Sequence, residues 1–128
     1  MKKVIVSENA PVPIGPYSHA NLVTPGSMLF VSGQVAKDAK TGELILGDIK
    51  SETKKIMQNI NAILTDSGMD FTNIVKTTIF LRSMDFFGGV NEVYGSFFKD
   101  GNFPARETVA VLGLPLNVNV EISVIAVK

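Results

Sequence analysis

The 128-residue sequence predicts an α+β fold, a six-stranded, mixed but mostly antiparallel sheet with two helices packed on one face. Six short runs alternate apolar and polar residues or are rich in β-branched residues, which is typical of strands. Two longer runs carry apolar residues at helical spacing. The order along the chain is β-β-β-α-β-α-β-β. No repeat or linker divides the sequence, so residues 1–128 are expected to form one domain.

Three strands are predicted near the amino terminus, at residues 3–7, 18–24 and 28–31. The loop at residues 10–16 contains three prolines, which stiffen the backbone because each fixes its own φ and restricts the residue before it. This loop delivers Tyr17. Pro25-Gly26 is a turn dipeptide, so the second and third strands are predicted to form a hairpin.

Helices and strands alternate in the rest of the chain. Helices are predicted at residues 48–67 and 83–98, and strands at residues 74–81, 105–112 and 118–127. Asp48 is the expected N-cap of the first helix, and Gly68 its C-terminal stop. Ser51-Glu52 is assigned to the solvent-facing side of this helix. Gly88-Gly89 should weaken the second helix by about 1 kcal/mol per glycine, and nothing in the sequence explains the pair.

The last two strands carry the residues on which a function can be based. Alternation places Arg106 and Thr108 on one face of their strand, and Glu121 on the polar face of the next. The link through Leu114-Pro115 is short, so the two strands are expected to be sheet partners, with their register left open. If they pair, Arg106 and Glu121 can face a common pocket.

Two helices can cover only one face of a sheet of this size. The runs at residues 28–31 and 74–81, however, carry apolar side chains on both faces. An exposed apolar sheet face would be prone to aggregation. We therefore expect the chain to self-associate through the uncovered face.

Composition and charge exclude several classes of function. Twelve basic and twelve acidic residues cancel, so no net field favours nucleic acid or an anionic membrane. Without cysteine there can be no disulfide, thiol catalysis or thiolate metal site. His19 is the only histidine, which argues against a histidine-based metal site or a Ser-His-Asp triad. No apolar run approaches the roughly 20 residues that span a bilayer, so a cytoplasmic protein is expected.

Short motifs extend over the whole chain: Ser7 to Pro11, Ile14-Gly-Pro-Tyr17, Val31-Ser-Gly-Gln34, Thr41-Gly-Glu43, Val75-Lys-Thr-Thr78, Asn91 with Tyr94, Pro104-Ala-Arg106, Leu114-Pro115 and Val120-Glu-Ile122. In this order they resemble the RidA (YjgF-type) family of reactive-intermediate deaminases. The resemblance implies a chorismate-mutase-like homotrimer with its helices outside and its pockets in the clefts between subunits. It also implies that no cofactor or metal is needed.

The resemblance assigns roles that context alone does not. From context, Arg106 could be a surface arginine in an ion pair, and Glu121 a solvent-facing strand residue. The family match implies that Arg106 grips the carboxylate of the substrate and that Glu121 positions the attacking water. Five further residues are implied to line the pocket: Tyr17, Ser32, Gly33, Asn91 and Thr108. Well-known members often carry cysteine at the position of Thr108. Threonine should serve there if the backbone makes the contact, whereas a side-chain role would be in doubt.

The implied activity is hydrolysis of reactive 2-imino acids, such as 2-iminobutanoate and 2-iminopropanoate, to 2-oxo acids and ammonia. Two other functions stay open. Some relatives are described as endoribonucleases that inhibit translation, although the balanced charge and single histidine argue against this activity. The same cleft could also belong to a non-catalytic protein that binds small 2-oxo acids, which would need Arg106 but not Glu121.

Overall fold

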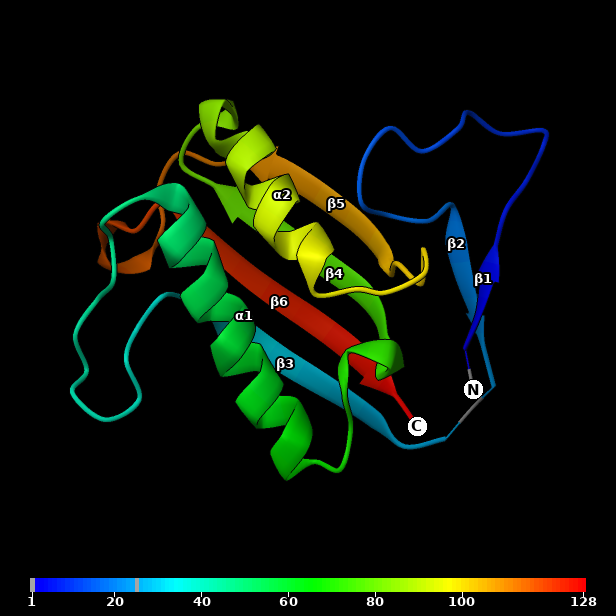
Figure 1. Cartoon of the computed structure of the whole chain (residues 1–128), viewed down its shortest axis with the longest axis horizontal. Coiled ribbons are helices and arrows are strands. Elements are labelled where there is room, and N and C mark those ends of the chain that lie inside the picture. Colours follow the sequence, from blue (N-terminus) through cyan, green and yellow to red (C-terminus); the bar gives the residue numbers. More distant parts are fainter. Residues whose placement is uncertain (1, 25) are drawn as a thin grey trace.

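The computed structural model of the chain describes residues 2–24 and 26–128 and has two helices on one face of a central sheet (Figure 1). Four strands form this sheet in the order β3 (Met28–Gln34), β6 (Val120–Val127), β4 (Ile74–Leu81) and β5 (Ala105–Ala110). β4 and β5 are parallel, whereas β6 is antiparallel to both β3 and β4. The predicted strand and helix content is therefore confirmed, and the sheet is mixed.

The other two strands form a separate antiparallel ribbon, whereas one six-stranded sheet was predicted. They are β1 (Lys2–Ile5) and β2 (Ala20–Val23). Side chains fasten the ribbon to the rest of the domain. The Nζ of Lys2 donates to the carbonyl of Ile74 at 3.0 Å, and the Nδ2 of Asn21 donates to the carbonyl of Phe103 at 3.3 Å.

The predicted hairpin between the second and third strands is wrong, because β2 pairs with β1 and β3 pairs with β6. Pro25, half of the expected turn, lies outside the described residues. Gly26 allows a close approach instead: a Cβ at this position would lie 2.3 Å from the carbonyl oxygen of Lys128. The backbone groups of Ser27 and Lys128 then exchange hydrogen bonds of 2.8 and 2.9 Å, which aligns β3 with β6.

The expected pairing of the last two strands is also wrong, because β4 lies between β5 and β6. β4 and β5 are connected through α2 (Phe87–Ser96), and a helical crossover of this kind joins parallel neighbours in a sheet. Adjacency in sequence therefore misled the prediction for β5 and β6. The register of these strands decides to which face the candidate site residues point.

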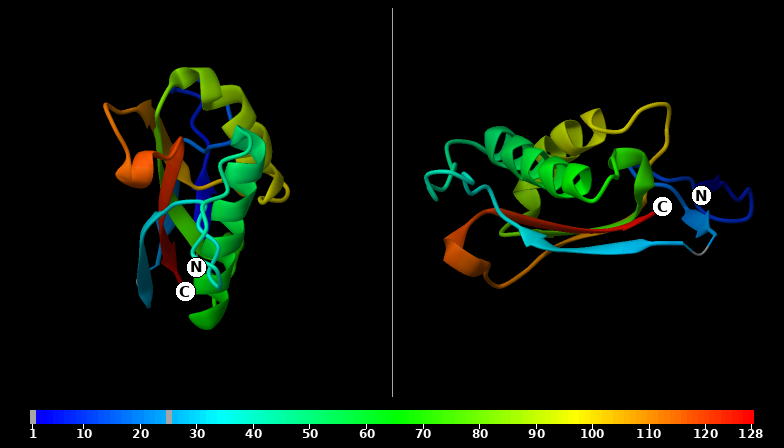
Figure 2. Two further views of the ribbon diagram at one scale, coloured as in Figure 1. Left: turned by 90° about the vertical axis from the view of Figure 1, so that its left-hand side faces the viewer. Right: turned by 90° about the horizontal axis from the view of Figure 1, so that it is seen from below.

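The helices lie on the same side of the sheet, as the right-hand view of Figure 2 shows. α1 (Ile49–Asp66) begins after the predicted N-cap Asp48, whose Oδ1 accepts from the backbone N–H of Ser51 at 2.9 Å. Four apolar side chains of α1 are fully buried, Ile56, Met57, Ile60 and Leu64. No helix in the described part of the chain has the length and apolar character needed to cross a membrane.

The assignment of Glu52 to the solvent-facing side of α1 is wrong, because its side chain is fully buried. Its carboxylate accepts from the backbone N–H groups of Asn119 and Val120, at 2.9 and 3.2 Å, and from the Asn119 amide at 2.8 Å. These donors satisfy the buried charge. Glu52 thus holds the start of β6 against α1.

The glycine pair in α2 has different surroundings at its two positions. A Cβ at Gly89 would lie 2.8 Å from the Cγ2 of Ile49, whereas a Cβ at Gly88 would have no neighbour within 4 Å. Gly89 therefore allows α2 to lie close to the start of α1. The cost in helix propensity is offset by this close packing at position 89 alone.

No helix among residues 2–24 and 26–128 covers the other face of the sheet. Phe30 is 67% exposed and Met28 55% exposed on β3, and Val109 is 46% exposed on β5. Their neighbours Leu29 and Val31 point the opposite way, beneath α1. The predicted uncovered apolar face is present, and we refer to it below as the open face.

Candidate active site

Arg106 lies on β5 and points toward the face covered by the helices. It pairs in register with Thr77 of β4, which is buried and whose hydroxyl accepts from the hydroxyl of Tyr94 at 2.9 Å. The Nη1 of Arg106 donates to the Oδ1 of Asn91 on α2 at 2.8 Å. The guanidinium is thereby held between β5 and α2.

Three aromatic rings surround this guanidinium. Its Cζ lies 5.2 Å from the ring centre of Tyr94 and 5.9 Å from those of Tyr17 and Phe87. Such distances allow cation–π attraction, which is stronger where water is partly excluded. Burial lowers the pKa of Arg106, but an arginine remains charged at neutral pH despite such a shift.

The charge of Arg106 has no acidic partner among residues 2–24 and 26–128. The ion pairs in this part of the chain are Lys50–Glu92, Lys55–Asp38 and Lys76–Glu107. A partly buried cation without a counter-ion is costly unless an anion binds it. A guanidinium presents paired donors that match a carboxylate. This arrangement is suited to a small carboxylic acid.

The N-terminal loop brings Tyr17 to Arg106. The backbone N–H of Tyr17 donates to the carbonyl of Gly15 at 2.8 Å, which forms a tight turn. The next N–H, of Ser18, donates to the carbonyl of Pro104 at 3.2 Å, which fastens the loop beside the start of β5. The hydroxyl of Tyr17 accepts from the backbone N–H of Ile14 at 3.4 Å.

Thr108 shares the face of β5 that carries Arg106, because it pairs in register with the buried Ile79. Its Oγ1 is buried and has no hydrogen-bond partner within the described chain. A buried hydroxyl is normally paired, so a ligand or water is expected to complete this one. Four of the predicted site residues thus form one group, which we call the arginine group: Tyr17, Asn91, Arg106 and Thr108.

Glu121 lies on the opposite face of the sheet. It pairs with Phe80 of β4, which alternates with the buried Ile79 and Leu81 and so points to the open face. The expectation that Arg106 and Glu121 of one chain face a common pocket is therefore wrong. Arg106 is in register with Thr77 of β4 and Glu121 with Phe80, and these two residues of β4 point to opposite faces.

Ser32 and Gly33 are near Glu121. Both are exposed, at the irregularity in β3 between Val31 and Gln34. A Cβ at Gly33 would lie 2.6 Å from the Cδ of Glu121, so only glycine lets this carboxylate lie against the backbone. We call Ser32, Gly33 and Glu121 the glutamate group.

Sequence reasoning missed the roles of Phe87, Tyr94 and Gly15 around Arg106. No role was predicted for Phe87, and Tyr94 was named in the motif that it shares with Asn91. Phe87 lies four residues before Asn91 and Tyr94 three residues after it, and this spacing places the three side chains on one face of the helix. This spacing was the signal that could have grouped them.

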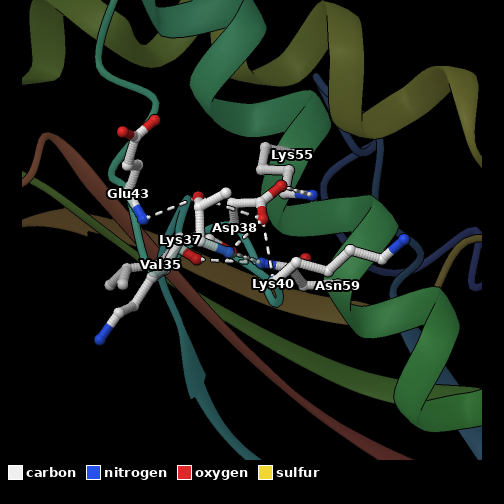
Figure 3. Close-up of polar contacts among 8 residues, drawn as sticks. Val35, Lys37, Asp38, Lys40, Glu43, Lys55 and Asn59 are labelled. Carbon is white, nitrogen blue, oxygen red and sulfur yellow. Dashed lines mark hydrogen bonds and ion pairs between the residues drawn. The ribbon is translucent and has the colours of Figure 1, made fainter.

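An open groove of about 670 Å³ beside Gly33 is lined by residues 33–35 and 37–42 and by part of α1. Figure 3 shows how polar contacts organise its wall. Asp38 accepts from the backbone N–H groups of Lys40 and Thr41 at 2.9 Å each, and the amide of Asn59 donates to two loop carbonyls. The N–H of Thr41 has the larger effect, and the two N–H groups together lower the pKa of the Asp38 carboxyl to about 2. These side chains stabilise the loop.

Other catalytic arrangements find little support. The only histidine, His19, uses both ring nitrogens to hold the N-terminal loop: Nδ1 accepts from the backbone N–H of Ser7 at 3.1 Å, and Nε2 lies 2.6 Å from the carbonyl oxygen of Pro11. No cluster of three or more metal-binding side chains occurs among the residues that the structure describes. The arginine and glutamate groups are the candidates for chemistry.

Comparisons with known proteins show what the whole chain is similar to. Residues 7–128 match the family described as Endoribonuclease L-PSP. Rat 2-iminobutanoate/2-iminopropanoate deaminase is 43% identical over 128 residues, which cover all of this chain and 91% of the rat protein. The YyfA protein of the conserved Rid family from Yersinia pestis matches over the full length of both chains, with 42% identity and a TM-score of 0.78. The YjgF gene product of E. coli matches over 98% of each chain, with 41% identity and a TM-score of 0.75.

Proposed function

This chain belongs to the Endoribonuclease L-PSP family, which includes the Rid proteins, and from this membership and its site we propose that it hydrolyses small 2-imino acids to 2-oxo acids and ammonia. The observation that carries the proposal is the guanidinium of Arg106, held by Asn91 and aromatic rings without an acidic partner in the described chain. A 2-imino acid has one carboxylate to fill this position. 2-Iminobutanoate and 2-iminopropanoate are the proposed substrates, as named for the rat relative.

The reaction requires little from the protein because the substrate is already electrophilic. Water attacks the carbon of the protonated imine, and the resulting carbinolamine loses ammonia, so that iminium and water become ketone and ammonium. The carboxylate of Glu121 orients the water, accepts its proton and returns that proton to the leaving nitrogen. Arg106 fixes the substrate by its carboxylate. Holding these reactants together supplies the acceleration, and the chemistry uses no cofactor.

Arg106 and Glu121 can act together only if they come from different copies of the chain. Within one chain they lie on opposite faces of the sheet. The open face displays Phe30, Met28 and Val109, an apolar surface that favours burial against another copy. We propose a homotrimer in which the arginine group of one subunit meets the glutamate group of the next. The implied intersubunit pocket would then bring the seven predicted residues together.

Two variants test the proposed roles in an assay that generates imine with a threonine dehydratase and follows its disappearance. Arg106→Ala should lose the acceleration, because the substrate carboxylate has lost its partner. Glu121→Gln should lose turnover but still bind 2-oxobutanoate, because the anion site is intact. A wild-type rate for Arg106→Ala would overturn the assignment. The wild type measured without dehydratase is the blank.

The family description keeps an endoribonuclease as the second candidate. The engagement of His19 in the N-terminal loop and the zero net charge do not favour it. A non-catalytic 2-oxo-acid binder is the third. If the protein consumes imine and leaves RNA intact, the deaminase is supported. RNA cleavage that persists in Arg106→Ala and Glu121→Gln would indicate a different site. Binding of 2-oxobutanoate without turnover would support the binder.

A further inference from the structure

Gly15 lies at the centre of the arginine group although it has no side chain. A Cβ at this position would lie 3.7 Å from the Nη2 of Arg106, 3.7 Å from the Nδ2 of Asn91 and 3.7 Å from the Cδ2 of Tyr17. These are ordinary van der Waals distances, and the φ of Gly15 is outside the left-handed region. Neither packing nor backbone conformation therefore requires glycine here.

The Nη2 of Arg106 and the Nδ2 of Asn91 lie near this position, and both are donors that take no part in the hydrogen bond between the two side chains. A guanidinium can only donate, so the atom of Asn91 that meets Nη1 must be Oδ1, as the 2.8 Å contact has it. The Nδ2 of Asn91 then faces the position above Gly15, as does the Nη2 of Arg106. Both remain able to donate to a ligand.

We propose that the unfilled position above Gly15 belongs to the carboxylate-binding subsite, and that the missing side chain keeps the Nη2 of Arg106 and the Nδ2 of Asn91 open to the anion. A carboxylate oxygen needs such donors at about 2.9 Å. A methyl group at position 15 would lie against both donors and shield them. The identity of the ligand as a small 2-oxo or 2-imino acid rests on the proposed function.

In this role Gly15 determines specificity sterically, because the absence of a side chain leaves both donors open to the anionic end of the ligand. The subsite should accept a small carboxylate, such as 2-oxobutanoate, and reject the uncharged 2-oxobutanamide, because the amide nitrogen presents donors to a site made of donors. The same reasoning gives Asn91 two tasks, since its oxygen holds Arg106 while its nitrogen binds the anion.

Gly15→Ala tests the proposal, with Gly47→Ala as the matched control, because a Cβ at position 47 has no neighbour within 4 Å and the φ of Gly47 is also outside the left-handed region. Binding of 2-oxobutanoate is measured by titration calorimetry, and folding by thermal unfolding. We expect all three proteins to unfold at the same temperature. The wild type and Gly47→Ala should bind equally, and Gly15→Ala at least about tenfold more weakly. Equal affinity of Gly15→Ala and wild type would overturn the proposal, as would a wild type that does not bind.

A second variant covers the case in which Gly15→Ala folds poorly. Asn91→Asp keeps the shape of the side chain and an oxygen for Arg106, but it replaces the donor by an acceptor. We expect it to lose 2-oxobutanoate binding, and unchanged affinity would contradict the inference. The proposed function can fail independently of the subsite. If Gly15→Ala weakens the binding of 2-oxobutanoate but the wild type does not hydrolyse imine, the deaminase is refuted and the subsite stands.

Discussion

Arg106 is the residue around which the local structure is arranged. Its guanidinium is held by the Oδ1 of Asn91 and by the ring of Tyr94, whose own hydroxyl is anchored on Thr77. Tyr94 therefore acts on Arg106 through its ring and on the core through its hydroxyl. Burial raises the pKa of Tyr94 above its usual range, so the hydroxyl remains a donor at neutral pH.

Tyr94→Phe separates these two tasks of the tyrosine. Without the hydroxyl, the buried Thr77 loses its donor, and we expect the free energy of unfolding to fall by about 1–2 kcal/mol. The rate of imine hydrolysis should stay within a few-fold of wild type, because the ring still supports Arg106. Urea unfolding and the dehydratase-coupled assay measure the two effects.

Tyr94→Leu is the comparison variant, because it removes the ring as well. It should lower both the stability and the rate, since the guanidinium loses its closest aromatic neighbour. Equal rates for Tyr94→Leu and Tyr94→Phe would show that the ring does not position Arg106.

The predicted site residues illustrate what a single sequence can and cannot establish at this scale. Arg106 and Asn91 were placed in one pocket only through the resemblance, and the structure brings them into contact from a strand and a helix. Glu52 was mistaken for a solvated residue because carboxylates are rarely buried. Its position three residues after Ile49 and four before Ile56, on the apolar stripe of α1, was the contrary signal.

At the scale of elements, α1 and α2 pack closely because Gly89 has no side chain. Ile49 would lie 2.8 Å from a Cβ at this position, whereas Gly88 has space around it. Adjacent glycines in one helix thus have opposite expected responses to the same substitution.

Gly88→Ala should raise the free energy of unfolding by about 0.5–1 kcal/mol, because alanine favours a helix more than glycine does. Gly89→Ala should lower it, because the methyl group would push α2 away from Ile49. The same urea titration on both variants checks this, and each serves as the control for the other. An equal gain in stability from both substitutions would contradict the close contact.

Elements were easier to predict than their partners. Apolar periodicity located both helices and the six strands, because it depends on residues close in sequence. Strand pairing depends on contacts between distant segments, and two expected pairs were wrong. β3 lies beside β6 because Gly26 leaves room for the carbonyl of Lys128, and β5 lies beside β4 because α2 connects these two strands.

At the scale of the whole molecule, the register of the strands places Arg106 and Glu121 on opposite faces of the sheet. The arginine group lies beneath the helices at the β5 edge of the sheet, and the glutamate group lies on the open face beside β3. The two groups therefore do not meet within one chain. The apolar open face, foreseen from residues that are apolar on both sides of their strands, is the surface through which copies would join them.

The activity of mixed oligomers tests this account most directly. Arg106→Ala and Glu121→Ala are purified separately and as a co-expressed mixture, and imine hydrolysis is measured for each. If a site takes Arg106 from one subunit and Glu121 from its neighbour, random assembly in a homotrimer rebuilds about one quarter of the sites. We predict that the mixture recovers about this fraction of wild-type activity while each variant alone is inactive. A mixture no more active than the separate variants would contradict the account.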